Sequence, residues 1–439
     1  MRNSLLTLAL AAGALFSQTT DWPSWRGPLH TGVSAADPTT TWSETKNIKW
    51  KTVIPGRGHS SPIIWKGKIY LTTAIETGKA ADVEKVKAVE AETPEFHRKS
   101  AHLPAKSLAF AVVAVNAADG KIVWKESMLE EIPFSATHAD GSWASGSSTT
   151  DGEHLYTYFG SYGLYCLDMN GKKIWSKRFG LMKMKANFGE GISPVLSGDL
   201  VIMNLDQESG SALVALDKKT GAEKWRVTRD EQTSWSTPLV VSVHGKTQIV
   251  VSATKKIRSY DAHNGTLIWE CAGMTGNVIP CPVFDGKNVI CMSGFRGASL
   301  LAIDIASAKG DITDSKSIVW SKQKDTPYVP SPVLADGLLY YLKANDGVIT
   351  CVRSADGAVQ YGPQKLEDMK QIFSSPIAAG KYIYLFGKDG TGVVLAKGSS
   401  FKVISVNKLD DGITASPAAI GGDLIVRGHT KLYCIANGK

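Results

Sequence analysis

The residues whose types could do chemistry recur at one position of a repeat and do not form a local motif. The sequence contains no H-E-x-x-H, no Walker loop, no G-x-S-x-G and no C-x-x-C. The acidic turn LDQESG at 205–210 lacks the spacing of a calcium loop. The candidates are instead aromatic, histidine, amide and carboxylate side chains that could surround a single opening. They are His59, Trp143, Glu190, Trp235, Asn277 and Phe373.

A repeat predicts the elements that position these residues. An apolar strand, a glycine-containing turn and a second strand with a tryptophan recur, for example as SALVALDKKTGAEKWRV (211–227) and KIRSYDAHNGTLIWE (256–270). Asn-Gly and Thr-Gly turns between alternating apolar residues are typical of β-hairpins. Because the period is in the forties and the units contain only strands, the repeat predicts a β-propeller.

A residue that opens the first strand of each unit gives the number of blades. Proline cannot donate to a β-ladder, so it suits the edge strand that lines a propeller channel. The anchors are Pro62, Gly146, Pro194, Pro238, Pro282, Pro332, Pro376 and Pro417. They predict an all-β, eight-bladed propeller over 47–437. Residues 47–54 resemble the outer strand of a unit, but no other strands precede them. Residues 416–436 resemble the first three strands of a unit and lack the outer one. We therefore expect the N- and C-terminal strands to share one blade.

The candidate site lies three residues before each anchor, where the loops between blades enter the channel mouth. The eight positions are His59, Trp143, Gly191, Trp235, Ile279, Val329, Phe373 and Thr414. One interpretation is a ligand site in which Trp143 or Trp235 stacks on a planar or sugar face, with Glu190 and Asn277 as oxygen ligands. The other, which we favour, is that these side chains plug the mouth and pack against an N-terminal segment.

The segments outside the repeat suggest export. Residues 1–19 contain one arginine and an apolar run from Leu5 to Phe16, which predicts a secretory signal peptide. Residues 20–46 are expected to form an irregular cap. An insertion at about 75–108 falls between the second and third strands of blade 1, and we expect it beside the channel mouth. No cysteine precedes Cys166, which excludes a lipid anchor directly behind the leader, so a periplasmic or secreted protein is expected.

The cysteine positions predict which cysteines are buried, and the charge distribution argues against a nucleic-acid partner. Cys166, Cys351 and Cys434 occupy a repeat position otherwise held by Ala or Ser, which predicts small buried side chains. Cys271, Cys281 and Cys291 lie close in sequence, and one pair could form a disulfide.

The net charge of +8 comes from charges scattered singly, and no basic run alternates with aromatic residues, so we expect no nucleic-acid partner.

The units LVALDKKTGAEKW and LYCLDMNGKKIW resemble the repeat of pyrroloquinoline-quinone (PQQ)-like propellers, over about 47–437. That family includes PQQ-dependent alcohol dehydrogenases and the outer-membrane assembly lipoprotein BamB, a scaffold without a cofactor. The dehydrogenases carry two adjacent, disulfide-bonded cysteines, which this sequence lacks, and hold calcium with a Glu, an Asn and an Asp. The resemblance would assign these roles to Glu190, Asn277 and Asp325.

We therefore predict an exported, non-catalytic, monomeric propeller that binds an envelope protein or polymer through its loop-bearing face, with no cofactor and no membrane span. The alternative is a PQQ- and calcium-dependent oxidoreductase of the alcohol or sugar dehydrogenase kind. In that case Glu190 and Asn277 would hold calcium, Asp325 would be the base, and Trp143, Trp235, His59 and Phe373 would surround the cofactor.

Overall fold

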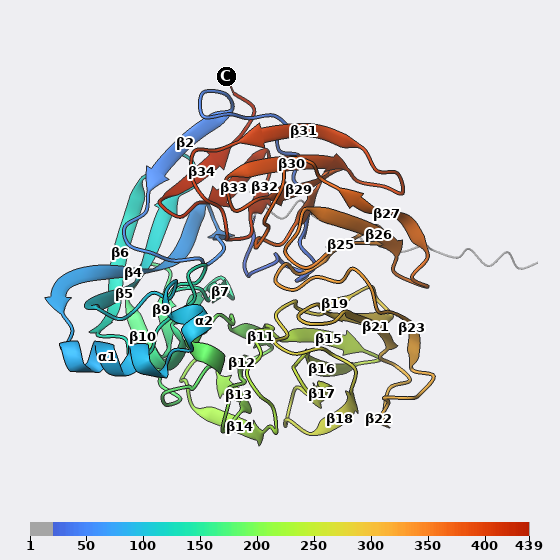
Figure 1. The fold of residues 1–439 in the computed structure, drawn as a ribbon, viewed down its shortest axis with the longest axis horizontal. Helices are drawn as coiled ribbons and strands as arrows, with labels where there is room; N and C mark the ends of the chain where they lie inside the picture. Colours follow the sequence, from blue (N-terminus) through green and yellow to red (C-terminus); the bar gives the residue numbers. More distant parts are fainter. Residues whose placement is uncertain (1–20, 439) are drawn as a thin grey trace, which may run out of the picture.

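The computed structural model describes residues 21–438 and confirms the predicted eight-bladed β-propeller. Eight sheets follow one another around a central channel (Figure 1), and in each the chain starts at the innermost strand and works outward. Blade 1 contains β3 (Ile63–Trp65), β4 (Lys68–Ala80), β5 (Lys106–Asn116) and β6 (Ile122–Glu131). Blade 2 contains β7 (Thr149–Thr150), β8 (His154–Tyr158), β9 (Leu164–Asp168) and β10 (Lys173–Lys177). Blade 3 contains β11 (Val195–Ser197), β12 (Leu200–Leu205), β13 (Ala212–Asp217) and β14 (Glu223–Thr228).

The next four blades repeat this order with small additions. Blade 4 contains β15 (Leu239–Val243), β16 (Lys246–Val251), β17 (Ile257–Asp261) and β18 (Leu267–Cys271), with β22 (Gly310–Asp311) at its outer edge. Blade 5 contains β19 (Val283–Phe284), β20 (Asn288–Ser293), β21 (Ser299–Asp304) and β23 (Ile318–Lys322). Blade 6 contains β24 (Val333–Ala335), β25 (Leu338–Leu342), β26 (Val348–Arg353) and β27 (Val359–Lys365). Blade 7 contains β28 (Ile377–Ala379), β29 (Tyr382–Phe386), β30 (Thr391–Ala396) and β31 (Val403–Lys408).

Blade 8 closes the ring with both ends of the chain, as predicted. It contains β32 (Ala418–Ile420), β33 (Asp423–Arg427) and β34 (Lys431–Ile435), and its outer strand is β2 (Ile48–Val53) from the N-terminal side. The β2 strand pairs antiparallel with β34, and Trp50 lies opposite Cys434. A shared blade leaves no open sheet edge between the first and last units of the ring.

The tryptophan of a blade packs against the turn of the next blade. Trp175 lies opposite Cys166 in its own sheet, and its indole N–H donates to the carbonyl of Lys218 at 3.0 Å. A Cβ on Gly221, whose φ is +72°, would lie only 2.7 Å from the Trp175 ring. A small residue opposite and a glycine beneath make room in this way for the indoles of Trp50, Trp124, Trp175, Trp225 and Trp320. The repeat cysteines are such small residues, and all six cysteines are buried and free, so Cys271, Cys281 and Cys291 form no disulfide.

A closed circle of hydrogen bonds joins the beginnings of the eight innermost strands. In each blade one residue donates its backbone N–H to the side chain of its counterpart in the next blade, over distances of 2.8–3.1 Å. We call these residues the polar ring. They are Ser61, Ser147, Ser193, Thr237, Cys281, Ser331, Ser375 and Ser416. The ring satisfies backbone donors that an edge strand would otherwise leave open.

Residues 21–42, which we call the strap, cross one end of the channel. At one end Trp22 exchanges backbone hydrogen bonds with Ile64 of blade 1. Farther along, β1 (Val33–Ser34) pairs parallel with β28 of blade 7. The strap thus joins the innermost strands of blades 1 and 7, which flank blade 8, and it carries Trp25 and Arg26 between these two contacts.

The insertion in blade 1 contains α1 (Val83–Glu92) and α2 (Glu95–Arg98), and lies beside the loops that follow blades 1 and 2 (Figure 1). Asp82 caps α1 by accepting the N–H of Glu84 at 2.9 Å. The insertion is held by backbone hydrogen bonds between His102 and Thr137. Short 3-10 turns at η1 (Gly160–Tyr162) and η2 (Lys185–Asn187) shape the neighbouring loops.

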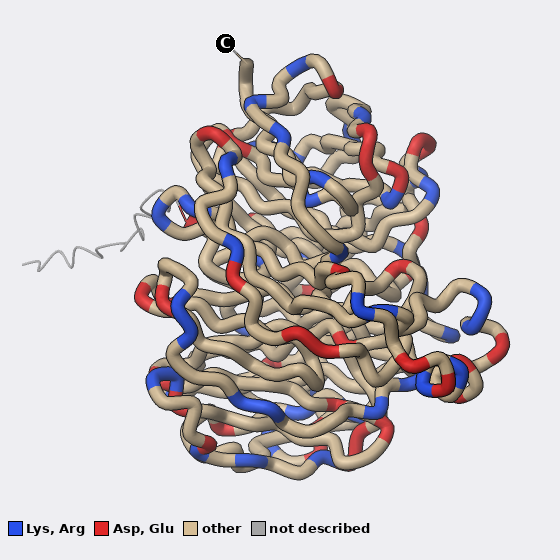
Figure 2. Tube along the Cα trace, turned by 90° about the vertical axis from the view of Figure 1, so that its left-hand side faces the viewer, with Lys and Arg blue, Asp and Glu red and all other residues tan. Residues whose placement is uncertain are grey.

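Lys and Arg positions are interspersed with Asp and Glu positions along the chain trace (Figure 2). None of the helices within 21–438 has the length and apolar character needed to cross a membrane.

Candidate functional site

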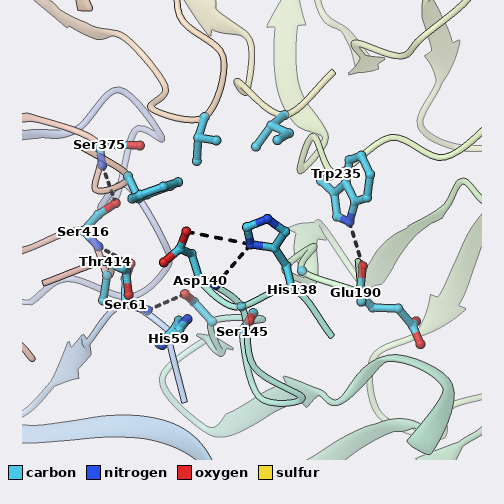
Figure 3. A pocket seen from close by; sticks show the side chains of 18 of the residues that line it. His59, Ser61, His138, Asp140, Ser145, Glu190, Trp235, Ser375, Thr414 and Ser416 are labelled. Atoms are coloured by element: carbon cyan, nitrogen blue, oxygen red, sulfur yellow. Dashed lines mark hydrogen bonds and ion pairs between the residues drawn. The ribbon is translucent and has the colours of Figure 1, made fainter. Parts of the chain in front are cut away.

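One cavity of about 380 Å³ occupies the channel (Figure 3). Seven of the eight predicted mouth positions line it, and Trp25 of the strap lines it as well. Those seven positions are His59, Gly191, Trp235, Ile279, Val329, Phe373 and Thr414. Pockets of this size hold small molecules, and an enclosure of aromatic side chains with a few polar groups is their usual lining.

Trp143 is the mouth position that the structure does not bring to this cavity. The polar ring places Ser147 in register with Ser61 and Ser193, so the blade 2 anchor is Ser148 and not Gly146. The residue three positions earlier is then Ser145, which lines the cavity. Trp143 instead lines a smaller adjoining pocket, and its indole N–H donates to the carbonyl of Ser135 at 3.0 Å. The alignment failed because no proline marks the start of this strand.

Aromatic rings form part of the cavity wall. The indole N–H of Trp235 donates to the carbonyl of Gly189 at 2.8 Å, which fixes the ring. Phe188, whose centroid lies 6.4 Å from that of Trp235, and Tyr328 also line the cavity. Sequence reasoning missed both, because they lie in loops of different length outside the three-residue register. Phe373 is on the lining too, with the Lys388 ammonium 5.7 Å from its ring centroid.

Four histidines from four separate segments meet in two pairs at the mouth. His97 of α2 stacks on His138, with ring centroids 5.2 Å apart, and both contact Phe188. Burial lowers the pKa of both histidines, and for His97 the neighbouring His138 lowers the pKa further. His59 lies 5.3 Å from His429, and burial together with nearby Arg57 holds the pKa of His59 well below its usual value. These imidazoles are therefore uncharged at neutral pH.

His138 and Asp140 were not identified from the sequence, although both line the cavity (Figure 3). The Nδ1 atom of His138 accepts the backbone N–H of Asp140 at 3.0 Å, and the Asp140 carboxylate pairs with Lys388 at 2.5 Å. Their H-A-D spacing in a loop matches no known site motif, so the sequence did not indicate that they belong to the site. Because Lys388 belongs to blade 7, Asp140 also links the loop between blades 1 and 2 to blade 7.

Glu190 turns its carboxylate away from His138 and Asp140 (Figure 3). That carboxylate accepts the N–H of Ser161 at 2.8 Å and the hydroxyls of Ser161 and Tyr158 at 2.7 and 3.2 Å. Burial raises the pKa of Glu190 to about 7, although these hydrogen bonds act to lower it. The donors come from blade 2 itself, so Glu190 joins a blade to the loop that follows it.

Of the three residues proposed for a calcium–quinone centre, only Glu190 lines the cavity. Glu190 is engaged by blade 2, whereas Asp325 is paired with Lys343 at 3.0 Å in blade 6. Asn277 is buried and its Oδ1 atom has no hydrogen-bond partner. Within residues 21–438 no group of three or more His, Cys, Asp or Glu side chains is arranged to hold a metal ion. The donor set therefore does not fit that centre.

The base of the cavity is made by the polar ring. Six of its members line the cavity, namely Ser61, Ser147, Ser193, Thr237, Ser375 and Ser416. The sequence did contain a signal for them, since a hydroxyl-bearing residue precedes most of the anchor prolines, as in SSP, ISP and STP. Hydroxyls below, aromatic rings at the sides and neutral histidines above make an arrangement suited to binding.

The family described as outer membrane protein assembly factor BamB matches residues 109–362, more than half of the chain. Among solved structures, BamB from Moraxella catarrhalis is similar at 14% identity with a TM-score of 0.54, over 74% of this chain and 93% of that one. The quinohemoprotein alcohol dehydrogenase from Comamonas testosteroni is similar at 11% identity with a TM-score of 0.65, over 96% and 81%. A europium-containing methanol dehydrogenase gives 11% identity and a TM-score of 0.65, over 95% and 98%.

At these identities the solved structures share the fold alone with this chain. No curated protein matches the sequence significantly.

Proposed function

The chain belongs to the family described as outer membrane protein assembly factor BamB, and from this premise we propose that it is an exported, non-catalytic binding protein of the cell envelope. In this proposal residues 1–19 direct export, and the face that carries the insertion holds an envelope protein or polymer. The protein acts as a monomer and without a cofactor.

The observation that carries this proposal is the exposed aromatic side chain at the mouth. Phe96 of α2 is 78% exposed, and its ring centroid lies 6.3 Å from that of Phe188, which lines the cavity. The loop that contains Phe188 also carries Leu181, which is 63% exposed. Large apolar side chains exposed beside a concave site are typical anchors for a partner.

A binding role is favoured over catalysis by the way the polar groups near the mouth are engaged. The Asp140 carboxylate is held by Lys388 and that of Glu190 by Ser161. A general base must reach a substrate proton with a free lone pair. Here the carboxylates serve contacts between segments of the propeller.

Site-specific crosslinking in the producing cells tests the proposal. A photoreactive amino acid at Phe96 should give a discrete adduct with an envelope component. The same residue at Val406, which is 48% exposed on the outer strand β31, serves as the matched control and should not. Equal adducts from both positions, or retention of the protein in the cytoplasm after fractionation, would contradict the proposal.

The oxidoreductase alternative has its own test. Purified protein is mixed with PQQ and calcium, and dye reduction is followed with alcohols and sugars. We expect no substrate-dependent reduction. Turnover that needs both PQQ and calcium would overturn the non-catalytic assignment.

A further inference from the structure

The hydroxyls of the polar ring have unused hydrogen-bond donors. Each of the six that line the cavity accepts a backbone N–H from the preceding blade. None of the six donates its own proton to any acceptor among residues 21–438. A hydroxyl has one O–H donor besides its acceptor lone pairs. Six hydroxyl donors are therefore available around the axis of one cavity. A ligand with several hydrogen-bond acceptor atoms would match them.

A positive charge lies beside the ring and has no carboxylate partner. Arg26 of the strap is only 3% exposed, and its guanidinium donates to the carbonyls of Pro332, Pro376 and Thr31. Pro332 and Pro376 directly follow the ring members Ser331 and Ser375. Within the described residues no Asp or Glu forms an ion pair with Arg26, and its Nε atom is buried without a partner. Burial lowers its pKa to about 10, so it remains charged at neutral pH.

A second buried guanidinium stands on the blade 8 side of the channel. Arg427 is 2% exposed and donates to the carbonyl of Ser60 at 3.1 Å and to its hydroxyl at 2.5 Å. It also has no carboxylate partner among the residues that the structure describes. The two acids that line the cavity cannot offset these charges, because Asp140 is paired with Lys388 and Glu190 is directed into blade 2. Buried charges without a counter-ion are costly, and a bound anion would remove that cost.

We propose that the base of the channel binds an oxyanion, the carboxylate or phosphate of a small organic ligand whose body lies against Trp235, Phe188 and Phe373. The O–H donors of the polar ring hold the oxygen atoms, and Arg26 and Arg427 supply the positive field. The cavity of about 380 Å³ leaves room for an aromatic or aliphatic body above the charged group. Phe188 borders both this site and the exposed surface around Phe96, but the anion-binding base of the channel does not depend on which partner that surface binds.

Calorimetric titration of the whole protein in chloride-free buffer at low ionic strength tests this proposal. The probes are benzoate, inorganic phosphate and the neutral benzyl alcohol. We expect saturable binding of at least one of the two anions and at least tenfold weaker binding of benzyl alcohol. Benzoate without phosphate would assign a carboxylate ligand, and phosphate without benzoate a phosphate ligand. No anion binding, or benzyl alcohol binding as well as benzoate, would overturn the proposal.

Two kinds of variant test the residues. Arg26→Gln should weaken anion binding at least tenfold, since it removes the charge, whereas Lys49→Gln, which removes an exposed charge of blade 8, should not change it. Ser193→Cys and Ser416→Cys copy the thiol that already serves as an acceptor at Cys281, so the ring can still close. A thiol is a weak donor, and each variant should bind the anion at least threefold more weakly with an unchanged melting temperature. Unaltered affinity in both would contradict the role of the ring.

Discussion

Two buried arginines of the propeller differ in their partners. Arg229 lies in the wall and Arg26 at the base of the channel. Arg229 and Asp206, both completely buried, form an ion pair with Nε–Oδ1 and Nη2–Oδ2 distances of 2.8 and 3.2 Å. The third nitrogen of Arg229 donates to the hydroxyl of Tyr260. Arg26, equally buried, meets only carbonyl oxygens. The charge of Arg229 in the propeller wall is neutralised by a carboxylate. The charge of Arg26 at the channel base has no carboxylate partner among residues 21–438, which is what the proposed anion site requires.

The largest effect should come from breaking the pair in the wall. Asp206→Asn leaves the Arg229 charge buried and unpaired, so we expect the free energy of unfolding to fall by about 3–5 kcal/mol. Urea denaturation measures it. Asp336→Asn, at an exposed ion pair with Lys397, is the control and should cost less than about 0.5 kcal/mol. A similar small cost at Asp206 would refute the contrast between wall and channel.

A smaller effect is expected at the channel base. Arg26→Met leaves backbone carbonyls without donors but also removes an unpaired charge, so in anion-free buffer it should cost about 1–3 kcal/mol. Added benzoate or phosphate should then stabilise the native sequence and leave the variant unaffected. The comparison uses urea denaturation with and without the anion. A cost as large as that of Asp206→Asn would mean that Arg26 is mainly structural.

The stacked histidines at the mouth should make stability depend on pH. Their pKa values are lowered by burial in the folded state, so below about pH 6.5 the unfolded chain takes up protons that the folded chain does not. Stability must therefore decrease as the pH falls from 7 to 5. His97→Phe keeps a ring against Phe188 and should make this decrease smaller. An unchanged pH dependence would show that the insertion is not held through neutral His97.

Glu190 should act in the opposite direction and with the smallest effect. Its pKa is raised by burial to about 7 in the folded state, so between about pH 4.5 and 7 the unfolded chain loses a proton that the folded chain keeps. This contribution to stability is present at low pH and is lost as the pH rises. Glu190→Gln should therefore gain stability relative to the native sequence at pH 8 compared with pH 5. Parallel pH profiles would contradict the assignment.

The fold was predictable because each unit carries its own local signals. The hairpin turn, the Trp and the small residue opposite it, as in the pair Trp175 and Cys166, are specified within one blade. The closure of blade 8 followed from two incomplete units. The site was only partly predictable, because the mouth is built from loops of unequal length, and the Trp143 position was lost where Ser148 replaces the anchor proline.

The features that distinguish the channel depend on contacts between distant segments. Arg26 reaches Pro332 and Pro376 from more than 300 residues away, and His97 meets His138 only because the insertion folds back over the mouth. A periodic pattern carries no information about such contacts. The serine before Pro62 and its counterparts were visible in the sequence, but their role emerges only when eight blades bring them together.

The most direct test of the account is to locate an anion in the channel. Crystals grown without sulfate or phosphate would be soaked in selenate, whose selenium scatters anomalously. The account predicts an anomalous peak on the channel axis within hydrogen-bond distance of ring hydroxyls such as Ser193 and Ser416. Selenate confined to the outer surface, with only water in the ring, would contradict it.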